Sequence, residues 1–262
     1  MNISDKVALV TGAGSGMGRQ ITLELVRRGA SVVAVDMHQS ALEETCSLAG
    51  SLSSKISMVT LNVTDKAAVD ALPSKVGEID ILINNAGIIQ PFVPIKDLAV
   101  DDAKRVMDVN FYGPLYLIKA FLPGLLARPQ AHILNVSSMG AYAPVPGQSV
   151  YGASKAAVKL MTEGLRSELM GTNVGVTVVF PGAVNTNITT NSGLAMPEVG
   201  ADAPKFKSLD ADIAAKMMVD AIVKNKPRIT VGKDATMMDR LSRLNPVFAA
   251  NLIYKQMKSL LQ

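Results

Sequence analysis

A tyrosine and a lysine stand four residues apart in the segment VYGASKAAVKL, which spans residues 150–160. Residues at positions i and i+4 of a helix lie on the same face, so the Tyr151 phenol and the Lys155 ammonium can share one small volume. A cation beside a phenol favours the phenolate, and this allows tyrosine to exchange a proton near neutral pH. An interfacial tyrosine beside a solvated lysine has the same spacing, so the chemistry of this pair depends on the rest of the chain.

A glycine-rich turn follows the first apolar run, with the sequence TGAGSGMG at residues 11–18. Its spacing differs from the G-x-G-x-x-G fingerprint, but the physical effect is the same. Residues without Cβ let the backbone approach a pyrophosphate, and the next helix offers free N–H groups and the positive end of its dipole. A turn without any ligand is the alternative. We expect a dinucleotide here, and its predicted contacts are Gly12, Ser15, Gly16, Met17 and Gly18.

An acidic residue, Asp36, ends the second apolar run. Dinucleotide-binding folds place at this point the acid that hydrogen-bonds the adenosine ribose hydroxyls. A carboxylate accepts from the diol and repels a 2′-phosphate, and the nearby Ser15, Met37 and His38 bring no Lys or Arg to attract one. We therefore expect NAD in preference to NADP. An ordinary turn or cap acid is the alternative interpretation of Asp36.

Seven short β-branched runs alternate with segments of helical periodicity, and they begin at Lys6, Ser31, Ile56, Ile79, Ala131, Val174 and Arg228. The runs are continuously apolar, which is typical of parallel strands covered by helices on both faces. No Pro/Gly/Ser-rich linker and no internal repeat interrupts them. The pattern predicts an α/β protein with one Rossmann-type domain over residues 1–262 and a doubly wound seven-stranded parallel sheet. Ligands in such sheets bind beyond the carboxyl ends of the strands.

The composition excludes several classes of function. The chain has 262 residues, of which 48% are hydrophobic and 18% charged, and its net charge of +4 comes without a Lys/Arg run that would indicate a nucleic-acid partner. One cysteine and two histidines offer neither a disulfide nor a metal site. No uncharged apolar stretch reaches the roughly 18 residues of a membrane span, and the amino terminus lacks a signal-peptide pattern. We expect a cytoplasmic protein.

These motifs, in this order, resemble the short-chain dehydrogenase/reductase family in its compact single-domain branch. The resemblance covers nearly the whole chain. Besides the glycine turn it includes Asn62-Val63, NNAG at 84–87, Asn110, NVSS ending at Ser138, Tyr151-x-x-x-Lys155 and PGAVNT at 181–186. The chain departs from the family's pattern at Asn62, where aspartate is common, and at Gly140, which follows the serine pair one residue early.

The resemblance implies a catalytic role for four residues. Tyr151 would be the general acid/base, and Lys155 would lower its pKa and bind the nicotinamide ribose. Ser138 would hold the reacting oxygen; Ser137 is its rival, but adjacent strand residues face opposite sides. Asn110 would hold a water that links Lys155 to solvent. The resemblance and the motifs also predict cofactor contacts at Met37, Asn62, Val63, Asn85, Ala86, Gly87, Pro181, Gly182, Val184 and Thr186.

The substrate is expected to be a hydrophobic secondary alcohol or its ketone. The segment at about 187–209 has little periodicity and is expected to lie over the cleft. The predicted substrate contacts, which include no Arg for a carboxylate, are Ser138, Met139, Tyr142, Tyr151, Leu194 and Met196. A helical tail at about 234–262 interleaves apolar residues with Arg and Lys. Packing on the domain or on another subunit is favoured for this tail over a membrane surface.

Two other functions remain open at this stage. A 3-oxoacyl-carrier-protein reductase would act on carrier-bound chains, but such enzymes generally prefer NADP, which Asp36 disfavours. A non-catalytic dinucleotide-binding protein would have no need for Asn110, Ser138, Tyr151 and Lys155 together. The resemblance also implies a homodimer or homotetramer.

Overall fold

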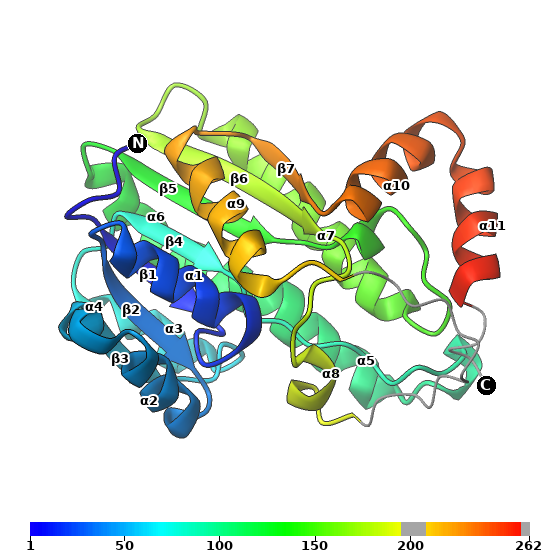
Figure 1. Ribbon diagram of the computed structural model, residues 1–262, viewed down its shortest axis with the longest axis horizontal. Helices are drawn as coiled ribbons and strands as arrows, with labels where there is room; N and C mark the ends of the chain where they lie inside the picture. Colours follow the sequence, from blue (N-terminus) through cyan, green and yellow to red (C-terminus); the bar gives the residue numbers. More distant parts are fainter. Residues whose placement is uncertain (195–207, 258–262) are drawn as a thin grey trace.

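The computed structural model describes residues 1–194 and 208–257. Its centre is a seven-stranded parallel sheet with the strand order β3-β2-β1-β4-β5-β6-β7 (Figure 1). The strands are β1 Val7–Thr11, β2 Ser31–Asp36, β3 Ile56–Thr60, β4 Ile81–Asn84, β5 Ala131–Val136, β6 Val174–Pro181 and β7 Arg228–Val231. The order reverses between β1 and β4, so the predicted Rossmann-type doubly wound sheet is confirmed, with its switch point beside the glycine turn.

Helices cover both faces of this sheet, which explains why β4 and β5 are buried at every position. α1 (Gly16–Arg27) and α9 (Ala211–Val223) pack on one face, and α6 (Gly113–Ala127) and α7 (Ser149–Glu168) pack on the other (Figure 1). The remaining α-helices are α2 Gln39–Leu48, α3 Lys66–Asp70, α4 Leu72–Val76, α5 Val100–Met107, α8 Ile188–Asn191, α10 Lys233–Leu244 and α11 Pro246–Met257. None of the helices in the described part of the chain is long and apolar enough to cross a bilayer.

A π-helical turn, η3 (Asp108–Tyr112), separates α5 from α6. Two residues after it explain the break. Gly113 packs so tightly that a Cβ there would lie 2.9 Å from Val63 Cγ2. Pro114 has no N–H, so one carbonyl of the preceding turn lacks its helical donor. The turn leaves Asn110 fully buried at the centre of the molecule.

A buried histidine on β5 couples the fold to pH. His132 is 2% exposed, and its Nε2 lies 2.7 Å from the Thr177 hydroxyl. That hydroxyl donates its own proton to the Lys226 carbonyl at 2.7 Å, so His132 must be the neutral tautomer that donates from Nε2. Burial lowers the pKa of His132 from 6.5 to about 4. The folded protein therefore resists protonation at this position.

Acidification should reduce the free energy of unfolding through His132. The contribution is complete above the unfolded-state pKa of 6.5 and is lost as the pH falls toward the folded-state value of about 4, because the unfolded chain binds the proton first. Its full size is about 3 kcal/mol. Urea unfolding at pH 7 and at about pH 4.5 should show a loss for the wild type that is about 2–3 kcal/mol larger than for His132→Gln, which keeps a donor for Thr177. Equal losses in the two proteins would contradict this assignment.

Candidate active site

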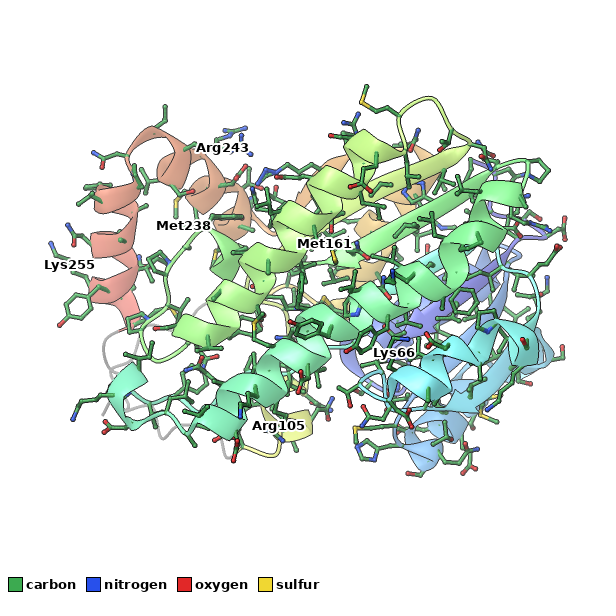
Figure 2. All side chains as sticks on the ribbon, turned by 180° about the vertical axis from the view of Figure 1, so that it is seen from behind. Lys66, Arg105, Met161, Met238, Arg243 and Lys255 are labelled. Atoms are coloured by element: carbon green, nitrogen blue, oxygen red, sulfur yellow. The ribbon has the colours of Figure 1, made fainter. Side chains whose placement is uncertain are left out.

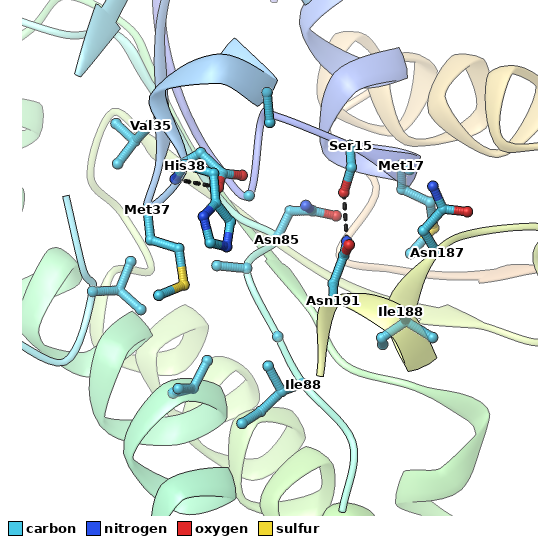
Figure 3. Close-up of a pocket in the computed structure, with 18 of the residues that line it drawn as sticks. Ser15, Met17, Val35, Met37, His38, Asn85, Ile88, Asn187, Ile188 and Asn191 are labelled. Atoms are coloured by element: carbon cyan, nitrogen blue, oxygen red, sulfur yellow. Dashed lines mark hydrogen bonds between the residues drawn. The ribbon is translucent and has the colours of Figure 1, made fainter. Parts of the chain in front are cut away.

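The turn between β1 and α1 forms one wall of a pocket at the carboxyl edge of the sheet (Figure 3). Gly12 and Gly16 have φ angles of 67° and 50°, which glycine adopts without strain. Gly18 packs on the turn itself, since a Cβ there would lie 2.0 Å from the Gly12 carbonyl oxygen. The geometry of this turn therefore requires glycine at these positions, and it brings the first residues of α1 to the pocket wall.

The pocket gathers most of the residues predicted to hold a dinucleotide. From that set it is lined by Gly12, Ser15, Gly16, Met17, Asp36, Met37, Asn62, Val63, Asn85, Ala86, Gly87 and Thr186. Among the residues that the structure describes, those that line the pocket do not include the predicted contacts Gly18, Tyr151, Lys155, Pro181, Gly182 and Val184. Pro181 ends β6, and the next residue lies against Asp234 of α10, whose Oδ2 accepts from the Ala183 N–H at 2.7 Å. Val184 packs on the apolar cluster beneath α9.

Asp36 places a carboxylate in the wall of this pocket. Its Oδ2 accepts from the Gly14 N–H at 2.9 Å, and its Oδ1 accepts from the His38 N–H at 3.1 Å. Glycine at position 14 permits this approach, because a Cβ there would lie 2.9 Å from Asp36 Oδ2. A carboxylate has more lone pairs than these two backbone donors use, so it can also accept from a ribose diol.

Asn85 contributes a polar atom that has no protein partner. Its Nδ2 donates to the Thr11 carbonyl at 3.0 Å, whereas its Oδ1 is buried without a hydrogen bond. Nearby, a Cβ at Gly87 would lie 3.1 Å from Lys155 Nζ. An unpaired acceptor, bare glycine backbone and a carboxylate in one pocket fit a ligand that carries hydroxyl, phosphate and amide groups, as a dinucleotide does. No group of His, Cys, Asp and Glu side chains in the described residues is arranged to hold a metal ion.

The Tyr151 and Lys155 side chains share one face of α7, beside the carboxyl end of β5. Lys155 is buried and its Nζ donates to the Val136 carbonyl at 3.0 Å. Burial lowers the pKa of Lys155 to about 8. Burial of the phenol raises the pKa of Tyr151, and a hydrogen bond with Ser138 opposes the rise. The sequence predicts that Lys155 lowers the Tyr151 pKa, but in this structure the loss of hydration dominates, and the phenol stays protonated at neutral pH.

The two serines at the end of β5 have different partners. The Ser138 hydroxyl accepts from the Gly140 N–H at 3.0 Å, and it lies close enough to the Tyr151 phenol to oppose the rise in the pKa of Tyr151. The Ser137 hydroxyl donates to the Lys155 carbonyl at 2.7 Å, so it attaches α7 to the sheet. The loop at the early Gly140 packs on the phenol ring, but a Cβ there would lie 3.4 Å from Tyr151 Cε1, an ordinary contact, so this packing does not require glycine.

The Asn110 amide is committed to protein groups. Its Oδ1 accepts from the Ile88 N–H at 2.9 Å, and its Nδ2 donates to the Ile88 carbonyl at 2.9 Å and to the Ser154 hydroxyl at 3.0 Å. It thereby joins the segment after β4 to α7. A water held by Asn110 has to bind its main-chain carbonyl or the remaining lone pair of Oδ1, because both side-chain donors are used.

Gln90 is a residue at this site that sequence analysis missed. It is 1% exposed, and its Oε1 accepts from the N–H groups of Val150 at 2.8 Å and Tyr151 at 3.0 Å. Its Nε2 donates to the Gly147 carbonyl at 2.9 Å. Gln148, the residue before α7, makes no side-chain cap of its own, so Gln90 supplies the cap from a distant segment. A separation of 60 residues in the chain leaves no local capping pattern that could have revealed it.

The predicted substrate residues fall into different surroundings. Met139 and Tyr142 pack beneath α10 and α11 with Met238 and Ile253. The Tyr142 hydroxyl donates to the Ala235 carbonyl at 2.9 Å, and burial raises its pKa, so this hydroxyl anchors the loop to α10.

Two further predicted substrate residues belong to the segment after Thr186. Leu194 follows α8, where its N–H donates to the Thr189 carbonyl at 3.1 Å, and Met196 lies outside the described residues. The described start of this segment covers the dinucleotide pocket, because Asn187, Ile188 and Asn191 line it. Figure 3 shows the Asn191 amide directed at the Ser15 hydroxyl, to which it donates at 2.6 Å.

Comparisons with known proteins agree with this architecture. The family model for short chain dehydrogenases matches residues 6–197. SadH of Mycobacterium tuberculosis, described as an oxidoreductase, is 35% identical over 253 residues, which cover 91% of this chain and 90% of that protein. Dehydrogenase/reductase SDR family member 7B of Mus musculus is 35% identical over 240 residues, covering 86% of this chain and 72% of that protein.

Two solved structures carry the nicotinamide cofactors. A short-chain dehydrogenase/reductase from Burkholderia phymatum in complex with NAD superposes with a TM-score of 0.84 at 26% identity, covering 95% of this chain and 96% of that chain. A short chain dehydrogenase from Burkholderia cenocepacia in complex with NADP gives a TM-score of 0.82 at 27% identity, covering 97% and 99%. The similarity extends over most of the chain, and this chain belongs to the short-chain dehydrogenase/reductase family of NAD(P)-dependent oxidoreductases.

Proposed function

We propose that this protein is an NAD-dependent oxidoreductase that interconverts a hydrophobic secondary alcohol and its ketone, with Tyr151 as the general acid/base. The observation that carries the proposal is the meeting of Tyr151, Ser138 and Lys155 at the carboxyl end of β5. A phenol, a neighbouring hydroxyl and a buried ammonium are the groups that proton transfer at a carbonyl oxygen requires. They stand beside the pocket that fits a dinucleotide.

The bound nicotinamide supplies the hydride acceptor for alcohol oxidation and the donor for ketone reduction. In reduction, Tyr151 gives its hydroxyl proton to the carbonyl oxygen of the substrate, while the Ser138 hydroxyl holds that oxygen beside the phenol. The raised pKa of Tyr151 keeps this proton in place at neutral pH. In oxidation, the phenolate must be stabilised to take the proton of the alcohol, and the Lys155 ammonium on the same helix face favours that charge.

The charges at the adenosine end support NAD rather than NADP. Asp36 stands in the pocket wall, and its negative charge repels a 2′-phosphate. Arg19 is close by on α1, but its Nη1 donates to Glu44 at 2.7 Å and its Nε to the Gly14 carbonyl at 3.0 Å. The hydrogen bond from Arg19 lowers the pKa of Glu44, which therefore stays ionised as the partner of this guanidinium. The Asp36 carboxylate would repel a 2′-phosphate, and Arg19 would attract it only weakly, because Glu44 already balances the charge of this guanidinium.

The apolar surroundings of the β5–α7 loop support the choice of substrate. Met139, Tyr142 and Val145 pack with α10 and α11 in a small apolar cluster. The Tyr142 hydroxyl is used by Ala235, so this wall offers hydrocarbon rather than free hydrogen-bonding groups. Apolar walls with few polar groups favour hydrophobic ligands.

Replacing Asp36 should move the cofactor preference toward NADPH. Asp36→Ser removes the repulsion of the 2′-phosphate and one acceptor for the ribose, so the ratio of NADPH to NADH affinity should rise about 10–100-fold. Fluorescence titration with both reduced cofactors measures it. Glu44→Gln is the matched variant, because it frees Arg19 while leaving Asp36 in place, and it should strengthen NADPH binding with little effect on NADH. Tighter binding of NADPH than NADH by the wild type would overturn the cofactor proposal and favour the ketoacyl reductase.

Tyr151→Phe should abolish most turnover without abolishing cofactor binding. Loss of the proton-transferring hydroxyl should lower kcat about 100- to 10,000-fold, measured by nicotinamide absorbance with a panel of hydrophobic secondary alcohols and ketones. Tyr254→Phe, which removes an exposed phenol hydroxyl on α11, is the control and should keep its activity. Retained activity in Tyr151→Phe would exclude the phenol as acid/base.

Gln90 should act as a positioning residue for Tyr151. Gln90→Leu leaves the N–H groups of Val150 and Tyr151 without their acceptor, so kcat should fall about 10-fold or more while the KM for NADH changes little. The pH profile of kcat should shift as well, because the phenol no longer sits against Ser138 in the same geometry. Gln90→Glu keeps the acceptor oxygen and should recover part of the activity. A loss of thermal stability with unchanged kcat and pH profile would limit Gln90 to a structural role.

A further inference from the structure

The turn between α10 and α11 presents large apolar side chains to solvent. Leu244, Val247 and Phe248, which we call the apolar corner, are 84%, 69% and 55% exposed, and every residue from 243 to 248 is exposed. Figure 1 shows the two helices at one end of the molecule, with the turn between them directed away from the sheet. Contiguous apolar exposure of this kind marks an interaction surface rather than ordinary surface composition.

The position of the corner is fixed by the inner sides of the same helices. Met238 of α10 and Ala249 and Ile253 of α11 form a buried cluster with Ala143. The sequence favoured packing of this tail on the domain or on a neighbouring subunit, and the structure shows the inner sides packed on the domain. The outer side, with the corner, has no apolar partner among residues 1–194 and 208–257.

Basic side chains lie along both helices. Arg240 and Arg243 are within one turn of Leu244, whereas Lys233 begins α10 and Lys255 lies near the end of α11. All four are exposed, and Figure 2 labels Arg243 near the turn and Lys255 farther along α11.

The two carboxylates of the same helices turn inward. Asp239 accepts from Arg228 at 2.6 Å and from Arg243 at 3.1 Å, and Asp234 accepts from the Ala183 N–H at 2.7 Å. The solvent-facing side of α10 and α11 is therefore apolar at its tip, with two arginines next to the tip and one lysine toward the far end of each helix.

We propose that the apolar corner and the basic side chains of α10 and α11 dock this protein on the surface of an anionic lipid bilayer. Apolar side chains at such a tip enter the boundary between headgroups and acyl chains, and each Lys or Arg near an anionic surface adds about 1 kcal/mol of attraction. A second copy of the chain fits less well, because a two-fold contact through the corner would bring the same basic residues face to face.

Docking in this way would turn the substrate side of the molecule toward the lipid. α10 and α11 pack on Met139 and Tyr142 of the β5–α7 loop, so the wall proposed for a hydrophobic substrate adjoins the docked surface. This consequence rests on the proposed function, whereas the docking itself does not.

Sedimentation with vesicles tests the docking directly. The protein should bind vesicles of phosphatidylcholine with about 30% phosphatidylglycerol at least ~10-fold more tightly than phosphatidylcholine alone, and about 0.5 M salt should weaken the binding. The triple variant Leu244→Ser, Val247→Ser, Phe248→Ser and the variant Lys233→Gln, Arg240→Gln, Lys255→Gln should each lose about 10-fold or more in affinity. Met170→Ser is the matched control, since Met170 is 70% exposed in the turn after α7 and precedes the amino end of β6, whereas α10 and α11 follow the carboxyl end of β7.

Either of two outcomes would overturn the proposal: no binding of the wild type to the anionic vesicles, or unchanged binding of the corner variant. If the wild type does not bind vesicles and light scattering shows that the corner variant changes from dimer to monomer, the corner is instead a contact between two copies of the chain. Turnover without vesicles should be the same in the wild type and both surface variants. Failure of the docking and failure of the proposed function are therefore read from separate measurements.

Discussion

Two hydrogen bonds between β5 and α7 set the position of the chemical groups. Lys155 Nζ donates to the Val136 carbonyl at 3.0 Å, and the Ser137 hydroxyl donates to the Lys155 carbonyl at 2.7 Å. Both bonds join buried groups, and a buried donor or acceptor left unpaired costs about 1–3 kcal/mol. α7 cannot rotate or slide along the sheet without breaking them. The arrangement that satisfies both is the one in which Tyr151 lies near Ser138, so the geometry proposed for catalysis follows from the pairing of buried polar groups.

The same burial opposes the charge that catalysis needs. It lowers the pKa of Lys155 to about 8 and raises that of Tyr151, because hydration is withheld from both charged forms. In such surroundings a new charge acts strongly, since little water is present to screen it. A positive nicotinamide ring nearby would favour the phenolate of Tyr151, whereas a neutral ring would leave the phenol protonated. With the proposed cofactor bound, its redox state and the protonation of Tyr151 would therefore depend on each other.

The sheet and much of the site could be predicted because they depend on residue patterns within short segments of the chain. The apolar run that begins at Ser31 is β2, and the acid at its end lies in the pocket wall. Three features could not be predicted, because they are contacts between distant segments. The cap of α7 comes from Gln90, the π-turn at Asp108–Tyr112 depends on the packing of Gly113 on Val63, and the amide of Asn110 bonds Ile88 and Ser154 instead of being free for water. The periodicity within one segment does not indicate which distant segment will pack beside it.

The dinucleotide side and the proposed substrate side of the site are supported by different apolar clusters. The dinucleotide side is built from strand ends and the glycine turn, which belong to the large apolar clusters on the two faces of the sheet. The substrate side rests on a small cluster in which Ala143, Met238, Ala249 and Ile253 are the buried members. Substitutions in this small cluster can reshape the wall proposed for the substrate while α7 stays in place, because Gln90 holds the Tyr151 N–H and β5 holds Lys155. The fold therefore separates the geometry proposed for proton transfer from the wall proposed for the substrate, and only the latter adjoins the exposed corner.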